Sequence, residues 1–374
     1  MDLAVFGSGV DATDSTELLY AERQFLASLS TQIVIVRSDA HDSHALMQAA
    51  LDSADQLGLR PHARVLLAKN TFLWPGPGTL SELMQVLDDG APVAFAYDST
   101  QPCPHLLPDY LTLRGLERYV SRLASQPNRP VLPGTPWPRL ALATVAAIRG
   151  GCKVEGAVWA ARAFAHDFSD YHQGRRDEVI PLIPATVRRV LDVGGGEGGF
   201  LTALKAHVGC ETHLAEFSSA ACAVAAERVD TVWPGDFVSA RIDVKFDCVT
   251  FLDVLEHTAW PVQWLRRAGQ LLEPGACVLA SIPNVGHWSV VLDLLEGRWD
   301  YAPAGIHCLT HLRFFTRHGV EQLMADAGLK IERIETTRVG IPPWFDVSAM
   351  AGNIEIDMDS LSTVAFLVLA RPVT

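Results

Sequence analysis

The sequence predicts an α/β protein of two domains, the second of which holds a parallel sheet with helices on both faces. In the second half of the 374-residue chain, short β-branched runs alternate with helical patterns, which is typical of such a sheet. A glycine-rich turn at 194–199 joins one of these runs to a helix. A proline-rich passage at 126–138 and the pair Gly150-Gly151 interrupt the pattern. We therefore predict an accessory α/β domain at 1–150 and a second domain at 151–374.

The first domain carries strand and helix signals of its own. Buried strands are predicted at 33–37, 64–68 and 92–97, with a helix at 80–87. The proline-rich passage cannot hold a helix or a central strand, so it is expected to cross the surface. Together these signals predict a small parallel sheet.

The second domain begins with a segment at 152–188 that is helical in pattern and polar in its middle. It leads into the strand before the glycine-rich turn. The remaining elements alternate regularly, and the ligands of such sheets bind beyond the carboxyl ends of the strands. We predict strands at 211–216, 231–236, 245–253, 275–283, 330–337 and 362–370, and helices at 218–228, 260–272 and 320–328.

Composition and charge indicate which kinds of binding partner the protein can have. A net charge of −13 argues against a nucleic-acid partner, which would require basic patches, and favours a small-molecule substrate. The seven cysteines form no C-x-x-C pair, so no disulfide framework or thiolate zinc site is predicted. No apolar run reaches the ~18 residues of a membrane span, and the amino-terminal residues lack the pattern of a signal peptide. We expect a cytoplasmic protein without a membrane partner; its oligomeric state stays open, with a homodimer as one option.

The glycine-rich turn is the first candidate binding site. Gly194, Gly196 and Gly199 match the G-x-G-x-x-G dinucleotide fingerprint, and the alternative to any ligand is a purely structural turn. Asp192 favours a different ligand, because a carboxylate two residues before the first glycine suits a cation better than a pyrophosphate. S-adenosylmethionine, which carries a sulfonium and an ammonium but no phosphate, fits this position.

Acids at the following strand ends extend this cofactor site. Glu216 lies twenty residues after Gly196, where a second-strand carboxylate accepts hydrogen bonds from ribose hydroxyls; the alternative role is to cap the helix that follows. Asp236 would lie near an adenine amino group, and the ring of Phe237 against the adenine face.

Two residues before the glycine-rich turn complete the predicted cofactor site. Tyr171 and Arg176 lie where the preceding segment could fold over a ligand, and a guanidinium is a natural partner of an amino-acid carboxylate. A solvated charged turn is the alternative.

From about 171 to 372 the chain resembles the class I S-adenosylmethionine-dependent methyltransferases. The motifs that carry the resemblance are the Asp-x-Gly-x-Gly loop, the second-strand acid, the Gly-Asp-Phe turn and the run at 246–257. The subgroup that it is most similar to is the ubiquinone-biosynthesis O-methyltransferase type. The resemblance implies a Rossmann-like seven-stranded fold and an enzyme that methylates a small molecule, most simply a hydroxyl of a secondary metabolite or sugar.

The same resemblance implies two sets of catalytic residues. At the end of the fourth strand, Asp253, Glu256 and His257 occupy the positions that hold a divalent ion such as Mg²⁺ in the subgroup, and Asp253 also faces the cofactor. His257 could instead be a general base, and all three could merely cap a turn. The segment at 305–316 retains His311 as a further catalytic candidate, but Cys308-Leu309 replaces the usual Asp-Arg pair.

A second, weaker resemblance concerns the first domain. The stretch at 65–83 is similar to the middle of nucleotide-sugar glycosyltransferases, in which an acidic pair after a strand binds a metal. Here Lys69, Asn70 and Thr71 stand in place of that pair. We therefore interpret this domain as a non-catalytic accessory domain.

Two other functions remain open for the second domain. Attack at another carbon of S-adenosylmethionine would transfer an aminocarboxypropyl group or close a ring, and would release methylthioadenosine. A cofactor sensor would bind without turnover. The products separate these alternatives, because methyl transfer leaves S-adenosylhomocysteine.

Overall fold

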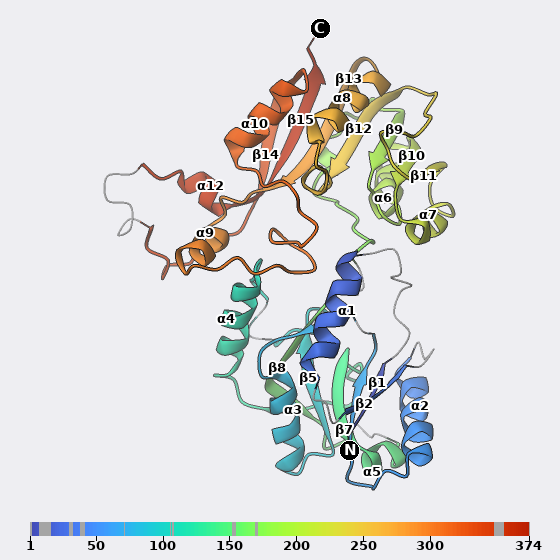
Figure 1. The fold of residues 1–374 in the computed structure, drawn as a ribbon, viewed down its shortest axis with the longest axis vertical. Helices are drawn as coiled ribbons and strands as arrows, with labels where there is room; N and C mark the ends of the chain where they lie inside the picture. The colour runs from blue at the N-terminus through green and yellow to red at the C-terminus, as the bar shows by residue number, and fades with distance from the viewer. Residues whose placement is uncertain are drawn as a thin grey trace. The chain divides into compact units, whose positions relative to one another are not determined.

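The chain folds into two compact units, which we call unit 1 and unit 2. The computed structural model describes residues 2–6, 16–29, 33–37, 42–70, 72–104, 106, 108–151, 155–168, 171–347 and 355–373. Unit 1 comprises Met1–Ser169 and Asp300–Ala304, and unit 2 comprises Asp170–Trp299 and Gly305–Thr374 (Figure 1). The division at Ser169 lies beyond the boundary predicted near residue 150, because β8 (Val158–Asp167) pairs with strands of unit 1.

Unit 1 is built around a mixed sheet with the strand order β2-β1-β3-β7-β5-β8-β4, and β6 pairs with β8. The prediction of a parallel sheet is wrong at β7 (Leu140–Thr144), which is antiparallel to both of its neighbours. The connection that precedes β7 returns the chain to the edge of the sheet at which β5 ends, so β7 enters in the opposite direction. The other strands are β1 (Asp2–Phe6), β2 (Ile33–Arg37), β3 (Arg64–Ala68), β4 (Leu73–Pro75), β5 (Val93–Asp98) and β6 (Arg129–Pro130).

Helices cover both faces of this sheet. Alternate residues of β3 point to opposite sides, so that Val65 and Leu67 join one apolar core and Leu66 and Ala68 join the other. Residues of α2 and α5 pack into the first core, and residues of α1 and α3 into the second. The helices are α1 (Thr16–Ser28), α2 (Ser43–Gln56), α3 (Thr79–Asp88), α4 (Leu113–Leu123) and α5 (Val145–Arg149).

The helical pattern expected at 152–188 is not a helix in the structure. Its first part is β8, which pairs with β5 and β4 and is buried along most of its length. The alanines of this stretch favour a helix locally, but pairing inside a sheet outweighs that weak propensity. Among the described residues of this stretch, the helical element is a short 3₁₀ turn, η1 (Ile180–Leu182).

Unit 2 contains the predicted seven-stranded sheet, in the order β11-β10-β9-β12-β13-β15-β14. The first five strands in this order are parallel, whereas β15 is antiparallel to β13 and β14, between which it lies. The strands are β9 (Arg189–Val193), β10 (Glu211–Glu216), β11 (Thr231–Pro234), β12 (Phe246–Leu252), β13 (Leu272–Pro283), β14 (Leu329–Arg338) and β15 (Thr363–Pro372).

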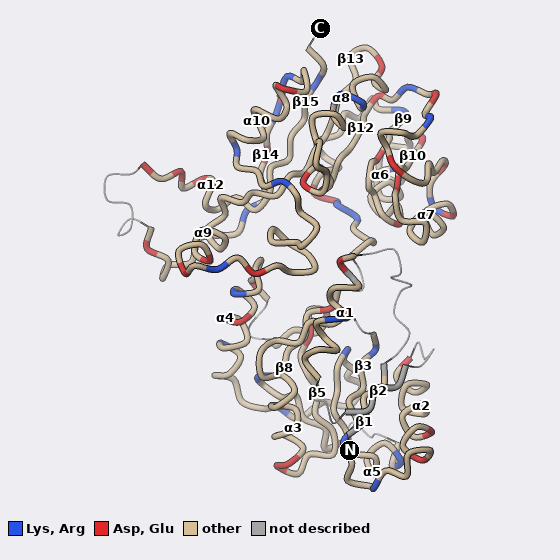
Figure 2. The backbone as a smooth tube through the Cα atoms, in the orientation of Figure 1, with Lys and Arg blue, Asp and Glu red and all other residues tan. Residues whose placement is uncertain are grey.

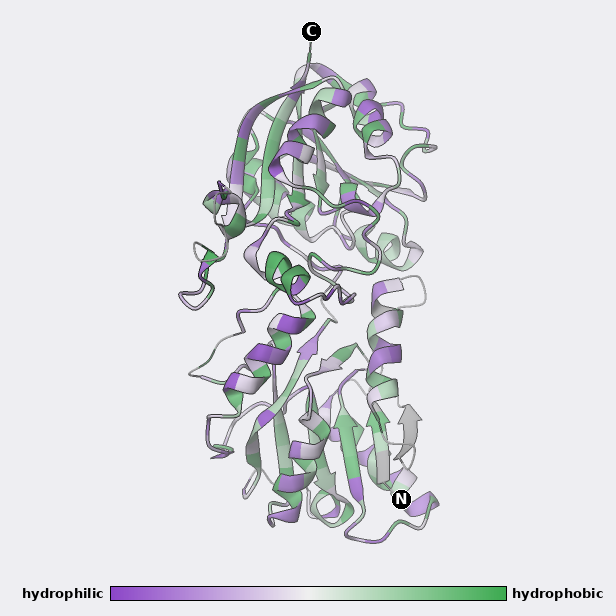
Figure 3. Cartoon of the chain, turned by 60° about the vertical axis from the view of Figure 1, so that its left-hand side comes forward, coloured by the Kyte–Doolittle hydropathy of each residue, from purple (hydrophilic) through white to green (hydrophobic). Residues whose placement is uncertain are grey.

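Two apolar cores lie on the two faces of this sheet. Residues of α6 and α7 pack into one core and residues of α8 and α10 into the other. Figure 3 shows the apolar residues gathered along the strands, as a sheet covered on both faces requires. The helices of unit 2 are α6 (Gly199–Val208), α7 (Ser219–Ala225), α8 (Pro261–Leu271), α9 (Trp288–Leu295), α10 (Arg317–Asp326) and α12 (Met358–Ser362), with a 3₁₀ turn η2 (Leu255–His257).

Charged residues of both signs are interspersed along the backbone of each unit (Figure 2). Within the described ranges, none of the helices has the length and apolar character needed to cross a membrane.

Candidate active site

The candidate site lies at one edge of the unit 2 sheet, where the parallel strands β9, β10 and β12 end. Asp192 is the penultimate residue of β9, Glu216 is the last residue of β10, and Asp253 directly follows β12. Because parallel strands end at the same edge, three acids from distant parts of the sequence meet there.

The glycine-rich turn makes its bends with left-handed backbone. Gly194 and Gly196 have φ of 74° and 56°, which favour glycine. The Gly194 N–H donates to the carbonyl of Ala215 at 2.7 Å. A Cβ added to Gly194 would lie 2.8 Å from a methyl carbon of Val254, so close packing inside the protein already requires glycine at this position.

The segment before β9 lies directly against this turn. The His172 carbonyl accepts a hydrogen bond from the Glu197 N–H at 3.0 Å, and a Cβ added to Gly196 would lie 2.6 Å from the same carbonyl oxygen. The ring of Tyr171 packs edge-on against that of His172. Tyr171 therefore lies beside a residue that contacts the turn, and its contact with a ligand stays a prediction.

Asp192 lies beneath the turn, with 1% of its surface exposed. Its Oδ1 accepts a hydrogen bond from Thr250 Oγ1 at 2.6 Å, whereas its Oδ2 has no hydrogen-bond partner. Burial raises the pKa of Asp192 to about 7, and the hydrogen bond from Thr250 limits that rise. The buried carboxyl is therefore poised to ionise when a cation approaches.

Glu216 is held in one orientation by two backbone groups. Its Oε2 accepts from the Gly196 N–H at 3.0 Å and its Oε1 accepts from the Ser218 N–H at 2.8 Å. The cap of α7 is Ser218 itself, whose hydroxyl accepts from the Ala221 N–H. Glu216 thus links the glycine-rich turn to the start of α7 and fixes a carboxylate at the end of β10.

The residues predicted to contact adenine are arranged differently from the expectation. Asp236 is exposed and accepts a hydrogen bond from the Ser239 N–H at 3.0 Å, so it caps a turn. Phe237 is only 2% exposed, and its ring packs against Phe251 and Trp264 in the core. In the structure this apolar side chain fills the core beneath the sheet edge, and its contact with the face of adenine stays a prediction.

Arg176 connects the segment before β9 to the ends of β12 and β13. Its guanidinium donates to Asp253 Oδ2 at 2.7 Å, to Ser281 Oγ at 2.9 Å and to Glu178 Oε1 at 2.6 Å. Ser281 in turn donates to Asp253 Oδ1 at 2.7 Å. In the part of the chain that the structure describes, Arg176 and Asp253 are the two non-glycine residues with positive φ. The guanidinium predicted to bind a ligand carboxylate is bound to protein carboxylates instead.

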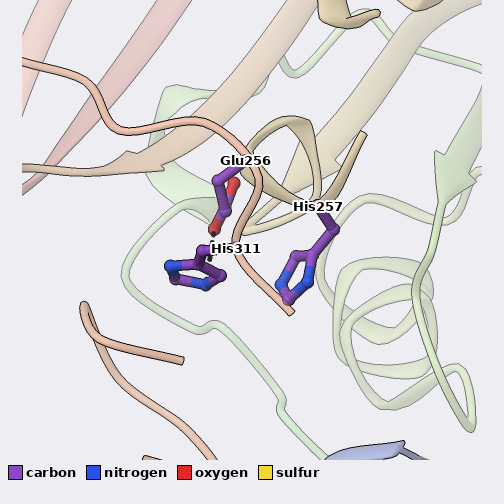
Figure 4. Close-up of side chains that lie close together, drawn as sticks. All are labelled: Glu256, His257 and His311. Carbon is purple, nitrogen blue, oxygen red and sulfur yellow. Dashed lines mark ion pairs between the residues drawn. The ribbon is translucent and has the colours of Figure 1, made fainter. Parts of the chain in front are cut away.

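A second cluster lies next to this edge and consists of Glu256, His257 and His311 (Figure 4). Each residue offers a ligand atom, and these atoms lie within 4.8 Å of one another. The imidazole rings of His257 and His311 meet edge to face with their centroids 4.6 Å apart. Glu256 Oε1 lies 3.9 Å from His311 Nε2.

The cluster is buried on the Glu256 side. Glu256 is 1% exposed, and neither of its carboxyl oxygens has a hydrogen-bond partner. Burial, and to a smaller extent the charge of Asp253, raises the pKa of Glu256 well above its usual range. Burial also lowers the pKa of His311 to about 4, and the neighbouring His257 adds to that effect. His311 is therefore a neutral imidazole near pH 7.

The predicted metal trio of Asp253, Glu256 and His257 is not the group that the structure brings together. Asp253 has positive φ and its carboxylate is bound to Arg176 and Ser281, so His311 takes its place beside Glu256 and His257. The sequence indicated His311 as catalytic but gave no reason to place it against Glu256.

Sequence reasoning missed two hydroxyl residues of the site, Thr250 and Ser281. Both lie inside strongly apolar strands, where a polar residue is unusual, and this was the available signal. His287 is buried and caps α9 by accepting a hydrogen bond from the Ser289 N–H.

An apolar cluster follows the fifth parallel strand. Trp288, at the start of α9, packs against Trp344 and Phe345 with ring centroids 5.9 Å away in each case. Phe345 is buried, whereas Trp344 is exposed.

Residues 161–334 match the family described as Methyltransferase domain. The ubiquinone biosynthesis O-methyltransferase of Cereibacter sphaeroides (strain ATCC 17029 / ATH 2.4.9) is 30% identical over 163 residues, which cover 41% of this chain and 64% of that protein. The protein of the same name from Thiobacillus denitrificans is 28% identical over 162 residues, covering 40% and 68%. The chain thus spans slightly less than two thirds of the first relative. The solved structure of the CcbJ methyltransferase from Streptomyces caelestis is 17% identical, with a TM-score of 0.38 and coverage of 54% of this chain and 90% of that one.

Proposed function

From the premise that residues 161–334 form a class I S-adenosylmethionine-dependent methyltransferase domain, we propose that the protein transfers a methyl group to a hydroxyl of a small molecule. The observation that supports this most directly is the meeting of Asp192, Glu216 and the glycine-rich turn at one sheet edge, next to a pair of histidines. Both relatives described above are O-methyltransferases by name, which favours oxygen as the acceptor atom.

The residues at this edge fit S-adenosylmethionine. Asp192 has a buried oxygen without a partner, which suits a ligand with two positive groups. Glu216 is already oriented by backbone donors, and carboxylate oxygens have lone pairs left for ribose hydroxyls. Gly194 and Gly196 keep side chains away from the turn. When bound, this cofactor supplies an electrophilic methyl group on its sulfonium.

The protein's own task is then to position the acceptor and remove its proton. His257 is the proposed proton acceptor. Its Nδ1 shares a hydrogen bond of 2.9 Å with Thr310 Oγ1, which fixes the orientation of the ring. His257 is partly exposed, in contrast to the buried Glu256, so its imidazole is the member of the cluster that an acceptor can reach.

The test is a His257→Ala variant assayed with S-adenosylmethionine and a cell extract as the source of acceptors. We expect kcat to fall by roughly 10²-fold or more, the usual scale for a lost general base, while the Kd for S-adenosylmethionine stays unchanged. Mass spectrometry should detect S-adenosylhomocysteine with the native protein. If methylthioadenosine were the product, the reaction would be attack at another carbon of S-adenosylmethionine and not methyl transfer. If neither product formed, the protein would be a cofactor sensor.

A further inference from the structure

We propose that Glu256, His257 and His311 form a binding site for a divalent ion of the zinc and iron class, and that Mg²⁺ is not its metal. This inference rests on the proposed function, because it assigns a metal to the acceptor side of the same site. It keeps the methyl transfer of that proposal but makes His257 a ligand of the metal in place of the proton acceptor. It departs from the Mg²⁺ site at Asp253, Glu256 and His257 that the sequence resemblance implies.

The residues at the expected positions do not fit Mg²⁺. Mg²⁺ requires oxygen ligands in near-octahedral geometry. Asp253 would have to supply one of them, but both of its carboxylate oxygens are bound, one to Arg176 at 2.7 Å and the other to Ser281 at 2.7 Å. The cluster that remains offers one carboxylate and two imidazoles, and imidazole nitrogens favour Zn²⁺, Fe²⁺ and their neighbours.

Glu256 points to a cation at this place. Its carboxyl group is 1% exposed, and neither oxygen has a hydrogen-bond partner, which is rare for a buried polar group. Its Oε1 lies 3.9 Å from His311 Nε2. Metal bonds of about 2.0–2.2 Å place two ligand atoms roughly 3–4 Å apart, so a metal fits between these atoms with little movement.

The hydrogen bonds of the two histidines are those expected of metal ligands. His311 Nδ1 lies 3.0 Å from the carbonyl oxygen of Ile306. Since a carbonyl only accepts, the proton must be on Nδ1, and Nε2 presents its lone pair toward Glu256. The ring of His257 is oriented by Thr310 Oγ1, 2.9 Å from its Nδ1; a hydroxyl can donate or accept, so this contact fixes the ring orientation and not the tautomer. Such outer hydrogen bonds fix the ring orientation and tautomer of metal-bound histidines.

Three protein ligands also match the proposed function. Structural zinc sites are closed by four protein ligands, whereas catalytic sites have three and keep a position for water or substrate. A site with Glu256, His257 and His311 therefore leaves room for an oxygen of the acceptor.

The experiment measures metal binding to the full chain without S-adenosylmethionine, so that it does not depend on turnover. After removal of metals with a chelator and dialysis, Zn²⁺ and Mg²⁺ are titrated separately by calorimetry, and Co²⁺ is followed by its visible absorption. We expect one Zn²⁺ per chain, bound at least about 10²-fold more tightly than Mg²⁺. His311→Ala should weaken Zn²⁺ binding by about 10-fold or more.

Two matched variants separate this site from the alternatives. Asp253→Asn should leave Zn²⁺ affinity unchanged, because its carboxylate is held by Arg176 and Ser281. His318→Ala removes an exposed histidine of α10 and controls for binding to surface histidines. His311→Gln, with thermal unfolding recorded for each variant, covers the case in which His311→Ala does not fold.

Equal affinity for Zn²⁺ and Mg²⁺, loss of binding in Asp253→Asn, or unchanged binding in both His311 variants would each overturn the inference. Methyl transfer that continues in chelator at the full rate would also overturn it while leaving the proposed function intact. If the protein bound Zn²⁺ tightly but produced no S-adenosylhomocysteine, the metal site would stand and the proposed methyl transfer would be contradicted.

Discussion

Buried acids of the two units differ in whether their oxygens accept hydrogen bonds, as Asp98 of unit 1 and Asp192 and Glu256 of unit 2 show. In unit 1, Asp98 ends β5 and accepts hydrogen bonds from the backbone N–H groups of Thr100, Gln101 and Arg139, at 2.8, 2.8 and 3.0 Å. In unit 2, by contrast, Asp192 Oδ2 and both oxygens of Glu256 have no hydrogen-bond partner. A saturated acid holds its own loop together, whereas an unsaturated one has binding capacity left.

Two basic residues of unit 1, Lys69 and Arg139, also have partners within the protein. Lys69 Nζ donates to the carbonyl of Trp137 at 2.7 Å, and Arg139 forms an ion pair of 2.8 Å with Asp167. These contacts stand where the glycosyltransferase resemblance would require a metal-binding acidic pair. We therefore propose that unit 1 performs no glycosyl transfer, and saturable hydrolysis of a nucleotide sugar by the full chain would contradict this.

The contrast is sharpest at Asp192, where the largest effect is expected. Its folded pKa of about 7 lies above the ordinary value of 3.8, so the folded state holds the proton more tightly. Stability from this group is full below about pH 4 and is lost as pH rises to about 7, by roughly 4 kcal/mol. Urea unfolding of Asp192→Asn should lack this loss. Asp236→Asn, at an exposed acid of the same unit, is the control, and parallel pH profiles for all three proteins would refute the assignment.

The next largest effect is expected at Gly196. In Gly196→Ala, the new Cβ would lie 2.6 Å from the His172 carbonyl in a backbone of φ 56°, so the turn must move. We expect the Kd for S-adenosylmethionine to rise by ~10²-fold, about 2.7 kcal/mol, measured by calorimetry. Gly209→Ala has a similar φ of 76° but no atom within 4 Å, and so isolates the cost of the backbone conformation. If both variants lost the same affinity, the glycine-rich turn would not be part of the cofactor site.

A smaller effect is expected at Glu216. Glu216→Gln replaces one carboxylate oxygen by an NH₂ group, which cannot accept from the N–H of Gly196 or of Ser218. We expect cofactor affinity to fall by about 10-fold, the scale of a hydrogen bond to a charged group. Undiminished affinity in the folded variant would show that this acid only joins the turn to α7.

The smallest effect on the cofactor is expected from the saturated acid of unit 1. Asp98→Asn should lower the free energy of unfolding by about 1–3 kcal/mol, because an N–H group would then be left without its acceptor. S-adenosylmethionine affinity should not change. A loss of affinity in this variant would break the distinction between the units.

The alternation of elements was sufficient to predict the sheet of unit 2, because its strands are short, apolar and separated by helical patterns. Unit 1 was harder. The direction of β7 depends on which edge the preceding connection reaches, and no local pattern encodes that. The segment that forms β8 is rich in alanine, and only its pairing with β5 makes it a strand.

The candidate site also contains residues whose positions a sequence pattern could predict and residues whose positions depend on contacts far along the chain. Asp192 and Glu216 were predictable because strand ends and glycine spacing place them directly. The orientations of Arg176 and Phe237 depend on contacts with residues far along the chain, Asp253 and Trp264. The approach of His311 to Glu256 likewise depends on how a long insertion closes, so a sequence pattern could indicate both residues without indicating that they meet.

The position of β15 affects how the protein is made. β14 pairs with β15 alone among the described strands, and β15 also completes the edge of β13. During synthesis, β14 therefore emerges from the ribosome before its pairing partner. Until β15 has been synthesised, one edge of β13 has no strand to pair with. Exposed strand edges of this kind attract other chains. We expect that a ribosome stalled between β14 and β15 holds unit 2 in a protease-sensitive form, and that resistance appears only once β15 is released.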